Sequence, residues 1–368
     1  MQIKFRCPTR IFLGPNCVME NSMEMSALGK KALIVTGANS AKASGALQDM
    51  ISALEQEGIA YSIFDEIEQN PSIKNVFEGG QAAKEFEAEF IIGIGGGSPL
   101  DASKAIAILA VNDITPEQLM AKQWSIEPLP IVAVPTTAGT GSEVTPYAIL
   151  TIDWAETKQS IAADSLFPIV AYLDGKYTLS LPWSITANTA VDALTHSIEG
   201  FINNKADSLT DLLALESIAI IGKLLRSIVP QQISLTEREE LLYASMLGGI
   251  VIAHTGTGII HALGYQLTYF NNLPHGLANG VVTKAVLEFL EQASPIKVKQ
   301  VVDALGCNNL DEVGALLIRV LPGVSISLTE EEQKKYVTKT LQAKNIANCP
   351  KPPKEEDLYK ILLSSKLC

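Results

Sequence analysis

Short apolar runs alternate with stretches of helical periodicity in the first half of the chain. Strands alternating with helices predict right-handed crossovers and therefore a parallel, doubly wound sheet. Before them, residues 1–14 form an irregular extended segment, and such a segment often pairs outside its own sheet, for example with a neighbouring subunit. The predicted strands span residues 31–36, 61–64, 90–94 and 130–134, and the predicted helices span residues 43–57, 72–87 and 101–109.

From about Leu181 onward the pattern changes. Apolar residues recur at helical spacing, as in 212–218, and Gly and Pro become rarer. A chain of 368 residues is also too long for one ordinary core. We therefore predict an α/β domain over residues 1–180 and an all-α domain over residues 181–368. The stretch KPPKEED at 351–357 predicts an exposed break before a short C-terminal helix.

Three loops rich in Gly, Ser and Thr follow predicted strands, at residues 36–45, 95–104 and 135–145. Parallel sheets of this class bind ligands at the carboxyl ends of their strands. The three glycines at 95–97 allow backbone N–H groups to approach a phosphate, and the next helix directs its positive N-terminus at the same anion. The chain lacks G-x-G-x-x-G and Walker motifs here, and a single such loop would be an ordinary turn. Three in one sheet favour a dinucleotide cleft.

All four histidines lie between residues 190 and 276. Asp192 lies four residues before His196 in a helical pattern, which places both side chains on one helix face. His261 and His275 lie on apolar segments, where buried imidazoles need partners. Three imidazoles and a carboxylate would form a mixed N/O site for a divalent metal such as iron or zinc. The alternative is chance, since a D-x-x-x-H pair is common and a lone histidine among apolar residues is usually part of a core.

Charge, cysteine usage and hydropathy narrow the choice of partner and compartment. The chain has 28 basic and 40 acidic residues, a net charge of −12, without a basic run, so we expect no nucleic-acid partner. It lacks both a signal-peptide run and an apolar stretch of the roughly 18–20 residues that span a bilayer. Five scattered cysteines without C-x-x-C predict reduced thiols. We therefore expect a cytoplasmic protein with no membrane partner.

Four motifs, in this order and spacing, resemble those of the iron-containing (group III) alcohol dehydrogenases. The resemblance covers essentially the whole chain. It implies a dinucleotide-binding N-terminal domain, a helical metal-binding domain of the dehydroquinate synthase-like fold, an active site in the cleft between them, and a homodimer. The motifs are GGGSPLDASKAIA at 95–107, PTTAGTGSEVT at 135–145, DALTHSIEGF at 192–201 and HALGY…LPHGLANG at 261–280.

The resemblance also implies roles for individual residues. It implies four ligands for Fe²⁺, with Zn²⁺ as the alternative, because the two metals share these ligand types. It further implies a pyrophosphate loop and a loop on the nicotinamide side. The ligands are Asp192, His196, His261 and His275; the pyrophosphate loop contributes Gly95, Gly96, Gly97, Ser98 and Asp101; the third loop contributes Thr136, Thr137 and Ser142.

Two positions near the ligands bear on catalysis. Many members carry a second histidine, often assigned to proton relay, four residues after the ligand at His261, where this chain has Tyr265. A phenol can pass a proton, but its ordinary pKa of about 10 suits it poorly as a base near neutrality. Tyr265 therefore either substitutes for that histidine or only forms part of the pocket wall. His254, where members often carry an amide, is the second candidate catalytic or pocket-lining group and not a ligand.

A third position differs from the pattern of the family and bears on the choice of cofactor. NAD-preferring members tend to have an Asp after the first strand, where it repels the 2′-phosphate of NADP, and this chain has Gly37. Ser40 and Lys42 follow, and a hydroxyl and an ammonium can hold a phosphate. We therefore favour NADP(H) over NAD(H). The alternative is that Lys42 is a solvated lysine at a helix start.

The resemblance thus implies an oxidoreductase that transfers a hydride between NADP(H), or NAD(H), and a small aliphatic alcohol, diol or aldehyde. The metal would act as a Lewis acid on the substrate oxygen. No arginine cluster near the ligands indicates a carboxylate or phosphate substrate. The alternatives are a glycerol dehydrogenase-like polyol oxidoreductase, a dehydroquinate synthase-like lyase, and a non-catalytic nucleotide or metal sensor. The first two manage with three protein ligands, so the fourth, His275, favours the iron-type family.

Overall fold

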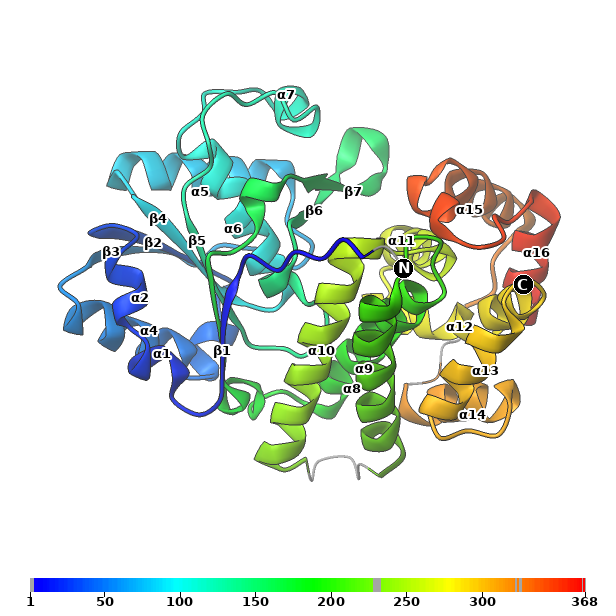
Figure 1. Ribbon diagram of the computed structural model, residues 1–368. Coiled ribbons are helices and arrows are strands. Elements are labelled where there is room, and N and C mark those ends of the chain that lie inside the picture. The colour runs from blue at the N-terminus through cyan, green and yellow to red at the C-terminus, as the bar shows by residue number, and fades with distance from the viewer. Residues whose placement is uncertain (1–2, 228–232, 322, 324–325, 366, 368) are drawn as a thin grey trace. The chain divides into compact units, whose positions relative to one another are not determined.

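The computed structural model describes residues 3–227, 233–321, 323, 326–365 and 367, which form two compact units (Figure 1). One unit spans Cys7–Leu181, and the other joins Pro182–Cys368 to the described residues before Cys7. The observed division thus falls one residue after the expected one. The expected domain of residues 1–180 is wrong for the first residues, because Phe5 stacks on His254 and the Arg6 N–H donates to that ring.

A six-stranded parallel sheet forms the centre of the α/β unit. The chain runs from β2 to β3 on one side and then crosses to β4 on the other, so the order of the strands reverses between β2 and β4. This confirms the predicted doubly wound sheet. The spatial order is β1 (Arg10–Leu13), β8 (Val170–Leu173), β5 (Ile131–Pro135), β4 (Phe90–Gly95), β2 (Lys31–Thr36) and β3 (Ala60–Phe64).

Side chains alternate between the two faces of the sheet along each strand, and helices bury both faces. In β2, Leu33 and Val35 contribute to the core with α5 (Ile73–Phe86) and α6 (Gly97–Leu109). Ala32 and Ile34 contribute to the core that includes α4 (Ala46–Gln56). Figure 1 shows α4 on one side of the sheet and α5 and α6 on the other. The shorter helices are α1 (Cys17–Glu20), α2 (Met23–Ser26), α3 (Ser40–Ala43) and α7 (Pro116–Met120).

Several details of the α/β unit differ from the sequence-based expectation. Residues 10–13 pair with β8 in their own sheet, so the expectation of pairing outside that sheet is wrong for them. We did not predict β8 or the antiparallel hairpin of β6 (Tyr147–Ile152) and β7 (Thr157–Ala162). Half-buried and buried side chains alternate along β6, and a short strand with one buried face carries a weaker sequence signal than the buried runs of the central strands.

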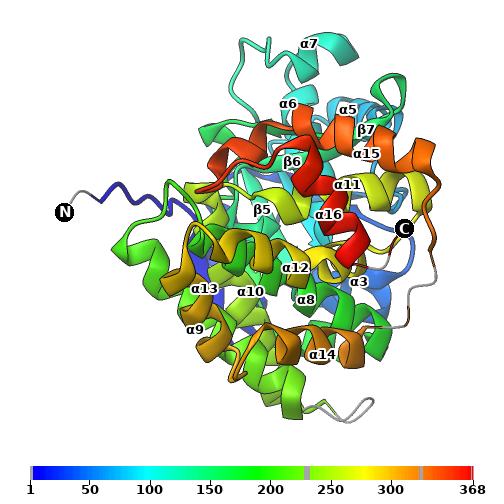
Figure 2. The same ribbon diagram turned by 90° about the vertical axis from the view of Figure 1, so that its right-hand side faces the viewer.

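The second unit is helical in every element that the structure describes, which confirms the all-α prediction. Helices α8, α9 and α10 pack against one another, and α12 packs against α8 and α11 (Figure 2). A buried chain of hydrogen bonds runs from Ser197 Oγ to Ser217 Oγ (2.7 Å) and on to the Ala244 carbonyl (2.8 Å), joining the first three helices. The elements are α8 (Trp183–Phe201), α9 (Ser208–Ser227), α10 (Leu235–Thr255), α11 (Ile259–Asn271), α12 (His275–Glu291), α13 (Pro295–Ala304), α14 (Leu310–Val320), α15 (Glu330–Gln342) and α16 (Glu355–Ser364).

Two further expectations concern membranes and thiols. Within the described ranges, no single helix has the length and hydropathy to cross a bilayer, and the pair α10 and α11 meets both criteria only together, across a bend of 108°. The four cysteines with described side chains are free thiols, as predicted, and Cys368 lies outside the described residues.

Candidate functional site

One face of α8 carries three buried polar side chains. Asp192, His196 and Glu199 lie at positions i, i+4 and i+7, so they follow one another along a single helix face. Their side chains face the interior of the helical unit, where a polar group without a partner costs several kcal/mol. The face therefore needs polar partners from neighbouring helices.

Helices α11 and α12 supply these partners. Gly256, with φ of +72°, ends α10 in a conformation that favours glycine, and α11 begins three residues later. His261 is consequently in the first turn of α11. His275 is the first residue of α12 and follows Pro274 at the N-cap position.

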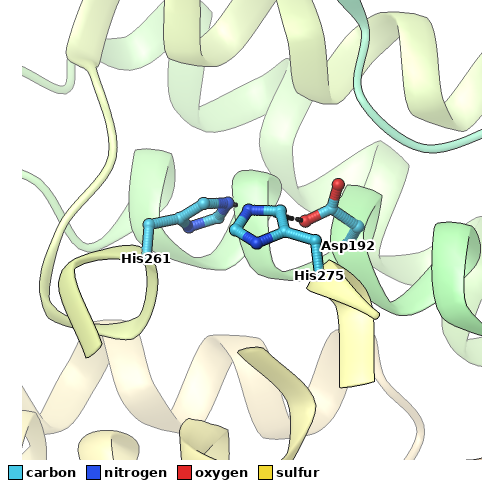
Figure 3. Close-up of side chains that lie close together, drawn as sticks. All are labelled: Asp192, His261 and His275. Atoms are coloured by element: carbon cyan, nitrogen blue, oxygen red, sulfur yellow. Dashed lines mark ion pairs between the residues drawn. The ribbon is translucent and has the colours of Figure 1, made fainter. Parts of the chain in front are cut away.

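Three side chains converge on one point, as Figure 3 shows. Asp192 Oδ1 lies 3.6 Å from His261 Nε2 and 3.8 Å from His275 Nε2. Three ligands at about 2.0–2.2 Å from one ion are roughly 3–4 Å apart, so these separations suit a shared metal. His261 Nε2 is buried and has no hydrogen-bond partner among the described atoms. An orphaned imidazole nitrogen facing a carboxylate fits the metal that the sequence predicts.

Each imidazole is oriented through its other nitrogen. His261 Nδ1 lies 2.7 Å from Glu199 Oε2, and His275 Nδ1 lies 3.2 Å from Thr268 Oγ1. The Glu199 carboxylate only accepts, so it favours the His261 tautomer whose Nε2 lone pair faces the metal position, whereas the Thr268 hydroxyl can donate to His275 Nδ1 or accept from it. The support of His261 is a buried carboxylate, whereas that of His275 is a hydroxyl beside a ring that is 25% exposed.

The electrostatics of the group favour an ionised carboxylate. Burial raises the pKa of Asp192, but the charges of His275 and His196 and the contact with His261 outweigh it and hold the pKa well below its usual value. Burial lowers the pKa of His261, but the contacts with the Asp192 and Glu199 carboxylates outweigh it and raise the pKa to about 9. A metal must therefore compete with a proton for this imidazole.

The fourth expected ligand, His196, occupies a different position in the cluster. Its ring stacks on that of His261 with centroids 4.5 Å apart and an interplanar angle of 17°. Among the described residues, the group whose ligand atoms all lie within 4.8 Å of one another contains Asp192, His261 and His275 and does not include His196. The role of His196 as a ligand stays a prediction.

The two candidate catalytic residues lie in different surroundings. The Tyr265 ring stacks on His275, with centroids 5.3 Å apart and an angle of 9°, and meets His261 edge-on. His254 Nε2 accepts the Arg6 N–H at 2.9 Å, and its Nδ1 lies 2.7 Å from the Ile250 carbonyl. Both of its ring nitrogens thus contact the backbone, and a catalytic or pocket-lining role of His254 stays a prediction.

The three expected cofactor loops do meet at one edge of the sheet. Strands β2, β4 and β5 are neighbours, and their ends are level, with Thr36 opposite Ile94 and Gly95 opposite Pro135. The loops after β2 and β4 flank the point where the strand order reverses, which is where this fold class binds ligands.

Close packing explains the glycines of the second loop. Gly95 has φ of +153°, and a Cβ there would lie 2.6 Å from the Pro99 side chain. A Cβ on Gly97 would lie 2.6 Å from Thr140, and one on Gly96 would lie 3.2 Å from Thr137 Oγ1. The second and third loops therefore pack directly on each other. Gly96 is also the N-cap of α6 and provides no side-chain cap, which leaves the first N–H groups of the helix for an anion.

The hydroxyl groups of Ser98, Thr136 and Thr137 in these loops differ in burial and in hydrogen-bond partners. Ser98 Oγ accepts the Asn70 N–H at 3.1 Å, in an exposed position. Thr136 Oγ1 is buried and has no partner among the described atoms, whereas Thr137 is half-buried.

Asp101 and Ser142, expected to bind cofactor, contact each other and Lys104. Ser142 Oγ donates to Asp101 Oδ1 at 2.5 Å, and the Ile149 N–H donates to Asp101 Oδ2 at 3.0 Å. Lys104 Nζ is fully buried and lies 2.7–2.8 Å from Ser142 Oγ and the carbonyls of Ser142 and Tyr147. These side chains connect α6 to the third loop and the hairpin, and their role in cofactor binding stays a prediction.

Burial controls the pKa values in this Lys104 cluster. It lowers the pKa of Lys104 to about 8, against the charges of Asp101 and Glu143. It raises the pKa of Asp101, and it raises the pKa of Glu143 to about 7 against a backbone hydrogen bond and Lys104.

The expected phosphate-binding group after β2 is not free. Gly37 and Ser40 lie at the end of β2 and the start of α3, and Lys42 Nζ forms an ion pair with Asp65 Oδ2 at 2.7 Å. That hydrogen bond lowers the pKa of Asp65. A 2′-phosphate would have to share Lys42 with this carboxylate.

Sequence reasoning missed Glu199 and Asn279. Glu199 lies three residues after His196, on the same face of α8, and this spacing is visible in DALTHSIEGF. Asn279 lies four residues after His275, and its Nδ2 donates to Asp192 Oδ1 at 2.9 Å. Both follow helical spacing from an expected ligand, so a search along the helix faces would have found them.

Comparison with known families gives two matches that together span most of the chain. Residues 8–175 match the family described as iron-containing alcohol dehydrogenase. Residues 186–366 match the C-terminal domain of the Fe-containing alcohol dehydrogenase family.

Individual proteins agree with these matches. The chain is 36% identical to a 1,3-propanediol dehydrogenase of Klebsiella pneumoniae over 305 residues, 82% of this chain and 79% of the other. It superposes on a crystal structure of an iron-containing alcohol dehydrogenase with a TM-score of 0.92 at 37% identity, covering 99% of both chains. A sulfoacetaldehyde reductase from Bifidobacterium kashiwanohense, solved in complex with NAD⁺, gives 0.89 at 28% identity, covering 100% of this chain and 99% of the other.

Proposed function

Because this chain belongs to the iron-containing alcohol dehydrogenase family and is an enzyme of that family, we propose that it transfers a hydride between NADP(H) and a small aliphatic alcohol, diol or aldehyde. The observation that carries the proposal is the convergence of Asp192, His261 and His275 with a buried, orphaned imidazole nitrogen. A buried cluster of this kind is costly unless something binds it.

The proposed metal is Fe²⁺, with Zn²⁺ as the alternative. Asp192, His261 and His275 would hold it, and His196 would complete the set from its stacked position. Carboxylate and imidazole ligands without sulfur suit either ion. When bound, the metal supplies Lewis-acid polarisation of the substrate oxygen.

The protein's own contribution is charge and orientation. With one carboxylate and neutral imidazoles, the ligands give a divalent ion one negative charge, so the site keeps a net positive charge. Glu199 and Thr268 contact the Nδ1 atoms of the two histidines, and His275 Nε2 also lies 3.3 Å from Asn279 Nδ2. Tyr265 covers His275 on one side.

For the dinucleotide, we propose the edge formed by the loops after β2, β4 and β5. Gly96 and Gly97 would admit the pyrophosphate to the N-terminus of α6. The preference for NADP(H) is supported by Gly37, which brings no carboxylate, and by Lys42 beside it. The NAD⁺ in the related reductase structure is a reason to test both cofactors.

The proposal is tested by anaerobic metal replacement. The full-length protein is stripped of metal, Fe²⁺ or Zn²⁺ is returned, and absorbance at the nicotinamide band is followed with NADPH or NADH and a panel of short aldehydes and diols. We expect Fe²⁺-dependent oxidation of NADPH by an aldehyde and the reverse reaction with the matching alcohol.

Each other outcome has a defined meaning. A preference for NADH contradicts the argument from Gly37 and Lys42 but leaves the metal argument intact. Activity restored by Zn²⁺ and not by Fe²⁺ contradicts the choice of iron. A lack of turnover with both cofactors and both metals contradicts the proposed reaction and favours a sensor or a lyase on this fold.

A further inference from the structure

Glu199 is a buried carboxylate that takes no part in the chemistry of the proposed reaction, and it contacts three groups at the start of α11. Its Oε2 lies 2.7 Å from His261 Nδ1 and accepts the Gly258 N–H at 2.9 Å. Its Oε1 accepts the Ile260 N–H at 2.5 Å. We propose that Glu199 is the positioning residue that fixes the tautomer and the orientation of His261; the inference rests on the proposed function, since it concerns metal binding.

The chemistry of the contacts determines the tautomer. An ionised carboxylate has acceptors only, so His261 Nδ1 must carry the proton that it shares with Glu199. In the neutral ring this places the lone pair on Nε2. That nitrogen is the buried atom without a hydrogen-bond partner in the described structure, 3.6 Å from Asp192 Oδ1. In the neutral ring, Glu199 therefore directs the Nε2 lone pair at the metal position.

The backbone contacts determine the orientation. The first N–H groups of a helix have no partner within the helix, and the Ile260 N–H is one of them. Glu199 satisfies it from α8, the helix that also carries Asp192 seven residues earlier. One side chain thus ties the helix of one ligand to the first turn of the helix of another, and a carboxylate there is favoured by the helix dipole.

A glycine makes this approach possible. A Cβ on Gly258 would lie 3.0 Å from Glu199 Oε1 and 2.8 Å from Cys349 Sγ. Any other residue at this position would push the carboxylate away from the backbone donors. The close packing leaves Glu199 only 3% exposed, so water does not compete for its oxygens.

Replacement of Glu199 by glutamine separates the hydrogen-bonding role of the side chain from its size. The side chain keeps its size, but one acceptor becomes a donor, which must face either a backbone N–H or the proton on His261 Nδ1. The imidazole then moves its proton or turns. Loss of such a partner typically weakens metal binding by about 10–100-fold, and we expect a loss of that size for Glu199→Gln.

Two further variants sharpen the measurement. Thr268→Val removes the hydroxyl contact of His275, which is longer and less buried, so we expect a smaller loss of metal affinity, about threefold. Ser197→Ala is the matched control, because Ser197 is buried on the same helix but bonds to Ser217 of α9. It is expected to lower the unfolding midpoint and leave metal affinity unchanged.

The experiment compares full-length wild type, Glu199→Gln, Thr268→Val and Ser197→Ala. Fe²⁺ and Co²⁺ dissociation constants are measured by competition with a chelator, and the histidine tautomers of the metal-free proteins are read from ¹⁵N NMR of histidine-labelled samples. Unfolding in urea reports any general loss of structure. With the His261 ring in its neutral form, we expect the Nδ1–H signal in wild type and its loss in Glu199→Gln alone. The loss of metal affinity should be largest in Glu199→Gln, smaller in Thr268→Val and absent in Ser197→Ala.

The possible failures are distinguishable. If wild type binds neither Fe²⁺ nor Co²⁺, the proposed function fails before Glu199 is tested. If wild type binds metal and Glu199→Gln binds it equally well with an unchanged tautomer, the positioning role is overturned. If Glu199→Gln lowers the unfolding midpoint as Ser197→Ala does, without a change in tautomer or affinity, Glu199 has only a structural role.

Discussion

Each unit of this protein buries a cluster of charged side chains, and the two clusters use their polar atoms differently. In the α/β unit, Lys104, Asp101 and Ser142 bind one another and nearby backbone groups. In the helical unit, Asp192, His261 and His275 turn three ligand atoms toward one point, and His261 Nε2 lacks a hydrogen-bond partner within the described part of the chain.

The difference separates structural polar groups from groups arranged for a ligand. A satisfied buried network holds loops in place, and removing one member leaves the others unpaired. An unsatisfied buried atom costs folding free energy and is retained where a ligand completes it. A substitution within one cluster should leave the other cluster unchanged.

The largest effect is expected for His261→Ala. The variant removes a ligand, and Lewis-acid catalysis contributes several kcal/mol, so we expect activity to fall by about a thousandfold together with the loss of bound metal. The circular dichroism spectrum should be retained. Metal content by atomic emission and turnover with an aldehyde check this, and a metal-free variant with full activity would contradict the assignment of the site.

The next largest effect is expected for Lys104→Met, which leaves Asp101 and two carbonyls without their buried cation. Breaking a buried ion pair costs about 3–5 kcal/mol, and we expect a loss of this order in the free energy of unfolding. Lys74→Met is the control, because Lys74 is 85% exposed. Metal affinity should not change in either variant, and a weakened metal site in Lys104→Met would show that the clusters are coupled.

Glu143 predicts a pH dependence within the same α/β cluster. Its pKa is raised by burial to about 7 from an ordinary value of 4.5, so between these pH values the folded protein holds a proton that the unfolded chain has lost. Stability from this group is full below about pH 4.5 and is lost as pH rises through 7. Glu143→Gln should match wild type at pH 4.5 and exceed it at pH 7.5 by up to about 3 kcal/mol in urea unfolding. An equal difference at both pH values would refute this account.

Tyr265 is expected to act through its ring and not through its hydroxyl. Ring stacking is worth about 0.5–1.5 kcal/mol, so Tyr265→Ala should weaken metal binding about threefold to tenfold. Tyr265→Phe keeps the stacking on His275 and should stay within about twofold of wild type in turnover and metal affinity. A Phe variant as impaired as the Ala variant, or with a changed pH–rate profile, would assign the phenol to proton relay.

The smallest effect is expected at the exposed pair of Lys42 and Asp65. Exposed ion pairs contribute at most about 1 kcal/mol, so Lys42→Ala should weaken NADPH binding by no more than about fivefold. Asp65→Asn should strengthen it, because the carboxylate no longer competes for Lys42. Fluorescence titration with NADPH tests both, with NADH as the internal reference. Equal changes for the two cofactors would exclude Lys42 as a 2′-phosphate contact.

The hydrophobic pattern of the sequence was sufficient to predict the central strands of the sheet. The runs at 31–36 and 90–94 are buried on both sides, and strands of this kind have few alternatives. The hairpin of β6 and β7 and the strand β8 were missed, since short or half-exposed segments carry a weak signal. The start of α6 at Gly97 was also missed, because glycine and proline in GGGSP suggest a loop until the packing of the loop against Thr140 is known.

Residue types and spacing by themselves determined the family, the alternation of strands and helices, and the set of metal-site candidates, because these depend on chemistry that local sequence records. Only the tertiary structure decided which polar groups are satisfied. Asp101 and Ser142 lie in a cofactor motif yet bind Lys104, His254 joins the N-terminal segment, and Glu199 supports His261 across 62 positions of sequence. Hydrogen bonding is a relation between groups brought together by folding, and one-dimensional spacing does not record it beyond a helix turn.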